Sequence, residues 1–206
     1  LLHHKIKKMK YILISLALLF LNLSGSGQRN TNYYNNQKLD TIDDRYHDYL
    51  EGYHFVDSIA DAYPNIVSLD TSWTTEIYDL KIPVLKISDN PTIEEDEPAV
   101  GFDGLIHSRE PVSMETCLLL IDYLVSNYGT DPQITEWIDN IEIFIIPALN
   151  IDGWKYVTDN DLSFPYWRKN LSDNNGNHVF DPDFDGVDLN RNFDYLWEYG
   201  PTDPSD

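Results

Sequence analysis

The chain has 206 residues, of which 42% are hydrophobic and 13% are aromatic. This composition suffices for one domain with a buried core and argues against intrinsic disorder. The formal net charge of −21 argues against binding to nucleic-acid phosphates or to anionic lipid.

The first residues have the composition of an export signal. Met9 and Lys10 precede an apolar run over residues 11–23, and small residues follow. This order is typical of a signal peptide, and the run is too short to span a bilayer comfortably. We therefore interpret residues 1–27 as a signal peptide with upstream residues and residues 28–45 as a polar lead-in. A secreted or extracytoplasmic protein without stable membrane insertion is expected.

Regular structure is expected from Tyr46 onward. A helix is predicted through about Ala62, where Tyr63-Pro64-Asn65 would end it. Residues 66–70 and 80–87 have the alternating or apolar character of strands. The start of the domain is therefore predicted to be a helix followed by two strands.

The middle of the chain alternates strands and helices. Residues 98–106 predict a short buried strand, and apolar residues at helical spacing predict a helix from Pro111 to near Gly129. A shorter helix is expected from Asp131, and residues 141–147 are predicted to form a central strand. The pattern indicates an α/β fold with a mixed central sheet and helices on both faces.

Cys117 is the only cysteine, which excludes an intramolecular disulfide. It lies on the apolar stripe of the helix predicted from Pro111, so we interpret it as a buried small residue. No suitably placed partner suggests that it is a nucleophile.

Three polar segments carry the chemistry of the sequence. The first, His107-Ser108-Arg109-Glu110, lies between the predicted strand and the predicted helix, where sites collect in open α/β sheets. Histidine and glutamate suit a hydrolytic zinc, although the pair taken alone is explained better by a surface histidine near a helix start. The other segments are Tyr166-Trp-Arg-Lys-Asn170 and Gly186-Val-Asp-Leu-Asn-Arg-Asn-Phe193.

In this order, the three segments resemble those of the zinc carboxypeptidases, a family that includes pancreatic digestive enzymes and secreted bacterial relatives. The resemblance runs from about Tyr46 to the last residue, and it implies that residues 46–206 are the N-terminal part of a zinc carboxypeptidase catalytic domain. Two departures are local. Tyr78-Asp79-Leu80 stands where the family often has Gly-Arg, and Ile151 stands where it usually has Pro.

The resemblance implies a catalytic Zn²⁺ with His107 and Glu110 as two of its protein ligands. It also implies that Asp188 accepts a hydrogen bond from His107, a contact that fixes the tautomer of the imidazole. A catalytic zinc lowers the pKa of water and polarises the scissile carbonyl.

The resemblance also assigns roles in substrate binding and catalysis. It implies that Arg168 stabilises the negative charge that develops on the oxyanion. Asn190 and Arg191 would bind the terminal carboxylate of a peptide, and Arg109 would assist substrate binding further out. A guanidinium can bind a carboxylate through two parallel hydrogen bonds, which suits recognition of a peptide or protein C-terminus.

Three family residues have no counterpart in this sequence: a third zinc ligand, a tyrosine and the glutamate that acts as general base. The family places them beyond the Asn-Arg pair, so we expect a fragment that is inactive or nearly so alone. His178 lies in a polar loop and is not expected to replace the missing ligand. The resemblance places the residues that line the family's specificity pocket beyond residue 206, so the sequence does not predict which C-terminal side chain is removed.

Residues 173–185 form an acidic loop whose first positions resemble a calcium-binding loop. Phe184 stands at the twelfth position, where a calcium loop has a bidentate glutamate. A Ca²⁺ site and a solvated turn loop are both compatible with this sequence.

The predicted function is hydrolysis of C-terminal residues from peptides by a zinc carboxypeptidase. Two alternatives are compatible with the same residues. One is a related zinc hydrolase that acts on amides or esters of small carboxylates, for which the Asn190-Arg191 pair would also serve. The other is a non-catalytic domain that binds carboxylates.

Overall fold

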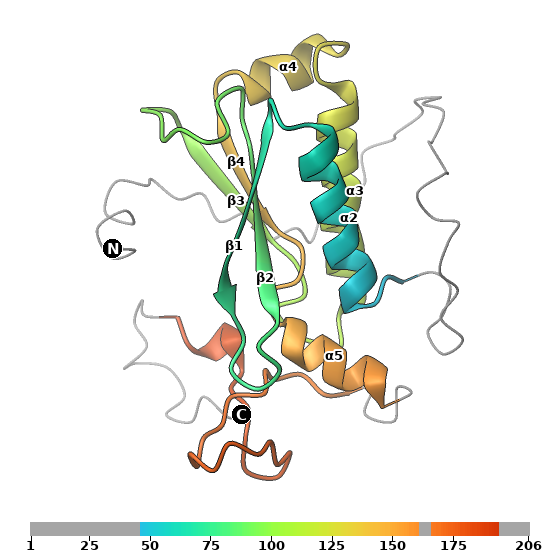
Figure 1. The fold of residues 1–206 in the computed structure, drawn as a ribbon, viewed down its shortest axis with the longest axis vertical. Coiled ribbons are helices and arrows are strands. Elements are labelled where there is room, and N and C mark those ends of the chain that lie inside the picture. The colour runs from blue at the N-terminus through green and yellow to red at the C-terminus, as the bar shows by residue number, and fades with distance from the viewer. Residues whose placement is uncertain (1–45, 161–165, 194–206) are drawn as a thin grey trace.

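The computed structural model describes residues 46–160 and 166–193 (Figure 1). The predicted signal peptide over 1–27 and the polar lead-in over 28–45 lie outside the described residues. The elements in chain order are α2 (Tyr49–Ala62), β1 (Val67–Thr74), β2 (Lys81–Ile87), β3 (Ala99–Asp103), α3 (Pro111–Asn127), α4 (Pro132–Ile138), β4 (Glu142–Ile146), α5 (Ile151–Asp159) and the 3₁₀ helix η3 (Leu189–Arg191).

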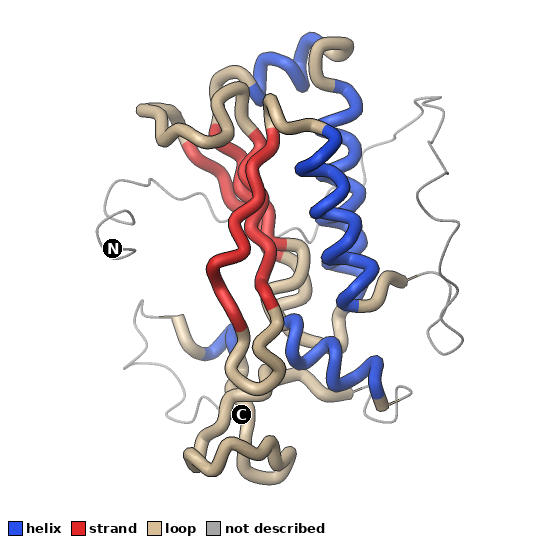
Figure 2. The backbone as a smooth tube through the Cα atoms, viewed as in Figure 1, coloured by secondary structure: helices blue, strands red, loops and turns tan. Residues whose placement is uncertain are grey.

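The four strands form one mixed sheet in the order β1-β2-β4-β3 (Figure 2). The pairs β1–β2 and β2–β4 are antiparallel, and β3 pairs with β4 in parallel. The prediction of an α/β fold with a mixed sheet is therefore confirmed. As predicted from residues 141–147, β4 lies inside the sheet, between β2 and β3.

The helices α2 and α3 lie side by side along one face of the sheet (Figure 1). On this face β2 contributes Leu85 and Ile87, and β4 contributes Ile143 and Ile145, all of them buried. Opposed residues pair across these strands, so their side chains form one apolar layer against the helices. This layer is the core of the described domain.

The start of α2 shows why the helix begins after Tyr46. Asp48 is the N-cap, and its carboxylate accepts the N–H of Glu51 at 2.7 Å. The Glu51 carboxylate in turn accepts the N–H of Asp48 at 2.9 Å. This reciprocal capping box satisfies two amides that have no partner within the helix. Tyr63 then ends the helix before Pro64, as the sequence predicted.

Two strands differ from their predicted bounds by more than one residue at an end. β1 extends to Thr74, four residues beyond the predicted end. β3 covers only Ala99–Asp103, and Gly101 and Asp103 are exposed. The strand predicted over 98–106 was therefore too long. The prediction of burial was also wrong for the face of the strand that carries Gly101 and Asp103. The reason is that β3 has one strand neighbour, β4, within the described sheet.

Cys117 lies on the inner side of α3 with 3% of its surface exposed, which confirms the prediction of a buried residue. Burial raises the pKa of its thiol to about 12, so the thiol stays protonated at neutral pH. Within the described residues, no helix combines the length and the apolar character needed to cross a bilayer.

Candidate functional site

The site begins at the turn between β3 and α3. Gly104 permits a close approach here, because a Cβ at this position would lie 2.5 Å from the carbonyl oxygen of Pro147. Leu105 has a φ of 51°, a left-handed conformation that its buried surroundings must hold in place. Its N–H donates to Ser113 Oγ, and its carbonyl accepts the N–H of Asn150. The turn that carries His107 is therefore fixed by its neighbours.

The turn brings His107 and Glu110 together. Nδ1 of His107 lies 3.0 Å from Oε2 of Glu110. The histidine side chain is buried, whereas 47% of the glutamate side chain is exposed. One nitrogen and one carboxylate oxygen thus lie within hydrogen-bond distance of each other, with the carboxylate partly exposed. Among the described residues, no group of three metal-suited side chains includes this pair with all ligand atoms within 4.8 Å of one another.

Asp188 occupies the other side of the imidazole. Its Oδ1 lies 3.2 Å from His107 Nε2, and its carboxylate also accepts the N–H of Asn190 at the start of η3. Because it contacts the opposite ring nitrogen, it cannot share a metal ion with His107 Nδ1. Burial raises the pKa of Asp188, but hydrogen bonds and charge from Arg168, with the Asn190 N–H and His107, outweigh it and lower the pKa overall.

Arg168 joins the same group. Its Nε donates to Asp188 Oδ2 at 2.7 Å, and one terminal nitrogen lies 3.8 Å from Glu110 Oε1. The Arg168 side chain is a quarter exposed, so part of it remains accessible to solvent beside the His107–Glu110 pair. A cation is therefore held within reach of any ligand that binds this pair.

The three other predicted substrate contacts are exposed. Asn190 and Arg191 lie on η3, two and three residues beyond Asp188, and the Arg191 guanidinium donates to the carbonyl of Asn190 at 3.2 Å. Arg109 lies between Ser108 and Glu110 and is exposed. The structure therefore places Asn190 next to the group formed around Asp188, whereas within the described residues Arg109 makes no hydrogen bond or ion pair with this group.

The start of α5 is connected by hydrogen bonds to the β1–β2 connection, which also contacts the loop after Arg168. Asp152 is buried and accepts hydrogen bonds from Thr75 Oγ1 at 2.6 Å and from the N–H of Ile77 at 3.4 Å, both in the β1–β2 connection. Burial raises the pKa of this carboxyl. From the same connection, Glu76 accepts a hydrogen bond from the hydroxyl of Ser172 at 3.2 Å. The helix, the hairpin and the loop after Arg168 are thus linked.

The acidic loop over 173–185 does not support the calcium interpretation. Asp173 accepts the backbone N–H groups of residues 175–178, and these bonds, that of His178 first, lower the pKa of its carboxyl. Asp185 accepts N–H groups from Asn174 and Asp181. The acidic side chains therefore close turns of the loop itself. His178 is exposed, and its imidazole lies beside Asp173 rather than beside His107.

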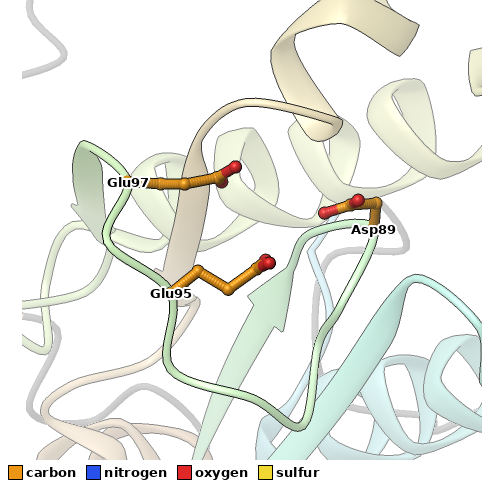
Figure 3. Close-up of side chains that lie close together, drawn as sticks. All are labelled: Asp89, Glu95 and Glu97. Carbon is orange, nitrogen blue, oxygen red and sulfur yellow. The ribbon is translucent and has the colours of Figure 1, made fainter.

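A second group of metal-suited side chains lies at the opposite end of β3. Figure 3 shows the carboxylates of Asp89, Glu95 and Glu97 pointing toward one another, with ligand atoms within 4.8 Å. The amide of Asn90 donates to Asp89 and to Glu95. Burial, together with Glu95 and Asp89, raises the pKa of Glu97. The group lacks a histidine and takes no part in the site around His107.

Two buried residues of the site have roles that the sequence did not reveal. Ser108 lies within the first segment, but its side chain faces the interior. Asn150 precedes Ile151 and had no predicted role, whereas it is the N-cap of α5 and accepts the N–H of Gly153. An Asn three residues before a Gly, after a predicted strand, is the local signal that could have indicated this cap.

Comparisons with known proteins agree on one family. The family model described as zinc carboxypeptidase matches residues 52–206. The zinc carboxypeptidase of Saccharothrix mutabilis subsp. capreolus is 36% identical over 152 residues, which are 74% of this chain and 33% of that protein. Carboxypeptidase D of Homo sapiens is 33% identical over 171 residues, which are 82% of this chain and 11% of that protein.

Solved structures show the same likeness. The crystal structure of thrombin activatable fibrinolysis inhibitor superposes with a TM-score of 0.62 at 27% identity, covering 80% of this chain and 36% of that one. Carboxypeptidase A from Helicoverpa armigera superposes with a TM-score of 0.57 at 31% identity, covering 72% of this chain and 34% of that one. The chain thus spans about a third or less of the length of the curated relatives described above.

Proposed function

This chain belongs to the zinc carboxypeptidase family, and from that premise we propose that its protein hydrolyses C-terminal peptide bonds with zinc held at His107 and Glu110. One observation carries the proposal. His107 Nδ1 and Glu110 Oε2 lie 3.0 Å apart, while Asp188 contacts the other ring nitrogen of the histidine. This is the arrangement in which a ligating histidine is oriented by a carboxylate.

The pair fits zinc in donor type and in spacing. Two ligand atoms about 2.1 Å from a tetrahedral zinc lie about 3.4 Å apart. The separation of 3.0 Å between His107 Nδ1 and Glu110 Oε2 requires only a small adjustment to reach that value. The exposed side of Glu110 leaves an entry path for the ion. Asp188 would keep the proton on Nε2, so that the lone pair of Nδ1 is available to the metal.

Zinc bound at this pair would act as a Lewis acid on the scissile carbonyl. The chain supplies the remaining charge stabilisation through Arg168. Its guanidinium lies 3.8 Å from Glu110, and Asp188 holds its Nε, so the terminal N–H groups are directed rather than free to rotate. Negative charge that develops on the carbonyl oxygen during hydrolysis would be stabilised by these donors.

We assign the binding of the terminal carboxylate to Asn190 and Arg191, and a contact further along the peptide to Arg109. All three side chains are exposed, and η3 holds the first two beside Asp188. The planar guanidinium of Arg191 can bind both oxygens of a carboxylate. The substrate class is therefore peptides or proteins with a free C-terminus.

Two ligands bind zinc less tightly than three, and the described residues offer no third ligand to this pair. We propose that a third ligand and a general base from outside the described residues complete the site, and that without them this part of the protein is inactive or nearly so. We also propose that the protein is exported, because residues 1–27 have the order of a signal peptide.

The test uses the longest product of the gene that contains this chain. Release of C-terminal residues from blocked dipeptides is measured with and without a zinc chelator. We expect the chelator to abolish release, added zinc to restore it, and Glu110→Ala to lower kcat/KM by at least about 100-fold. The matched control is Glu136→Ala, an exposed glutamate on α4.

Three results would contradict the proposal. Turnover that survives the chelator would exclude a zinc mechanism. Hydrolysis of small acylated amino acids without hydrolysis of peptides would indicate the related amide or ester hydrolase. Binding of zinc and of peptide C-termini without any turnover would indicate a carboxylate-binding domain.

A further inference from the structure

We propose that Ser108 and Asn150 are positioning residues for Arg168. The proposal rests on the role assigned to Arg168 above and deepens it. Neither residue touches the substrate site. Both hold the backbone from which the guanidinium reaches Asp188 and Glu110.

Ser108 makes two hydrogen bonds to this backbone. Its hydroxyl donates to the carbonyl of Trp167 at 2.6 Å, and its N–H donates to the carbonyl of Arg168 at 3.3 Å. The residue is 0% exposed, although it lies between the ligand His107 and the exposed Arg109. One residue thus fixes two consecutive carbonyls, which restricts both the place and the rotation of the segment.

Asn150 completes the attachment from α5. Its amide Nδ2 donates to the carbonyls of Arg168 at 3.3 Å and of Ile106 at 3.4 Å, and it is 2% exposed. Ile106 immediately precedes His107. The same amide therefore ties the turn that carries the metal ligand to the segment that carries the arginine.

The packing around these bonds leaves little room for movement. A Cβ at Gly153 would lie 2.7 Å from the carbonyl oxygen of Lys169 and 2.9 Å from Ser108 Cβ. The first turn of α5 therefore presses against both Ser108 and the residue after Arg168. Only a residue without a side chain permits this approach.

The position of this backbone matters because the arginine side chain is long. A backbone rotation of about 10° acting over about 6 Å moves the guanidinium by about 1 Å, and a misplacement of that size can cost about 100-fold in rate. Loss of the Ser108 hydroxyl would also leave the carbonyl of Trp167 without this donor. We therefore expect Ser108→Ala to disturb Arg168 beyond any general loss of stability.

The first test uses the 206-residue chain without metal or substrate. Arg168 Nε–H donates to Asp188 in a short, charge-assisted bond, which gives the proton a distinct and protected NMR signal. Arg168→Lys identifies this signal by removing it. We expect Ser108→Ala to shift the signal and to speed its exchange with water by at least about tenfold.

The matched control is Ser88→Ala. Ser88 is also 0% exposed, and its hydroxyl accepts the N–H of Asn90 at the opposite end of the sheet. Its loss should lower the unfolding midpoint without moving the Arg168 signal. An unchanged signal in Ser108→Ala, or an equal change in both variants, would overturn the proposal. If Ser108→Ala does not fold, Ser108→Cys decides in the same way, since a thiol is a weaker donor of similar shape.

The second test measures hydrolysis in the longest product of the gene that contains this chain. Ser108→Ala should lower kcat while KM changes less than about twofold, and it should cause little further loss in an Arg168→Ala background. A full additional loss there would show that Ser108 acts independently of Arg168. A protein without any hydrolytic activity would overturn the proposed function, while the NMR signal would still decide whether Ser108 positions Arg168.

Discussion

Nε2 of His107 lies 3.2 Å from Oδ1 of Asp188, a residue 81 positions further along the chain. In the proposed function, this carboxylate accepts a hydrogen bond from Nε2–H and so fixes the tautomer and the direction of the imidazole. We predict that Asp188→Asn lowers the zinc affinity of the protein by about 10- to 100-fold. Competition with a chromophoric chelator measures this affinity directly.

Asp183→Asn is the control for this change of charge, because Asp183 is an exposed residue of the acidic loop over 173–185, which precedes Asp188. Its zinc affinity should equal that of the unmodified protein. Equal losses in the two variants would mean that Asp188 acts only through net charge and not through its contact with His107.

Gly186 and Gly176 allow a comparison of two causes of strain. Both have positive φ, 88° and 73°, but only at Gly186 would a Cβ meet backbone, at 2.8 Å from the carbonyl oxygen of Asn170. We predict that Gly176→Ala lowers the free energy of unfolding by about 1–2 kcal/mol. Gly186→Ala should cost about 2–5 kcal/mol, because overpacking adds to the same conformational term.

Urea unfolding of the two variants measures this difference. A substitution at Gly186 that costs no more than the one at Gly176 would show that the loop moves away from Asn170 without strain. The segment leading to Asp188 would then be less tightly held than its hydrogen bonds indicate.

His47 and Glu115 should make the stability depend on pH. His47 Nδ1 lies 2.8 Å from Glu115 Oε2, and this hydrogen bond raises the pKa of His47 above 6.5 against the effect of burial. Charges on Glu115, Glu51 and Asp48 act in the same direction. Because the folded state binds the proton more tightly, the stabilisation is fully present below pH 6.5 and is lost as the pH rises through the raised pKa.

Urea midpoints below and above this window check the prediction. Glu115→Gln should lose stability mainly on the acidic side, which reduces the difference between the two conditions. Glu136→Gln, on the exposed side of α4, should retain the full difference. A pH dependence that is unchanged in Glu115→Gln would assign it to other groups.

Lys86 and Glu142 form a buried pair, with Nζ 2.5 Å from Oε1. Lys86→Met leaves the Glu142 carboxylate buried without its cation, and we predict a loss of about 3–5 kcal/mol in the free energy of unfolding. Adding Glu142→Gln should recover part of this loss, because the uncompensated charge is then gone. Urea unfolding of both variants compares the values, and a double variant no more stable than Lys86→Met would contradict this explanation.

Local signals predicted the part of the site that is close in sequence. The apolar run before His107 and the helical spacing after Pro111 are patterns of neighbouring residues, and the structure shows a strand, a turn and a helix there. The exposed face of β3 was less predictable, because burial of Gly101 and Asp103 depends on which elements lie beside the strand. Periodicity does not contain that information.

The helix α5 was missed for a different reason. Its residues include Gly153, Val157 and Thr158, which all have lower helix propensity than alanine. Tertiary contacts outweigh this preference, since almost every residue of the helix is buried and Asn150 caps it. The inward direction of Ser108 was equally hidden, because its partner at Trp167 is 59 residues away.

Hydrogen bonds join α5 to the β1–β2 connection, this connection to the loop after Arg168, and the Arg168 segment back to α5. The Asp152 carboxylate accepts the N–H of Ile77, and the Glu76 carboxylate accepts the N–H of Asp173. The Asn150 amide donates to the carbonyl of Arg168. Because breaking one of these hydrogen bonds removes a restraint on the next segment, the three segments should unfold locally as one cooperative unit. The amides of Ile77 and Asp173 should therefore exchange with solvent deuterium at a common rate, and a substitution at Asp152 should accelerate both together.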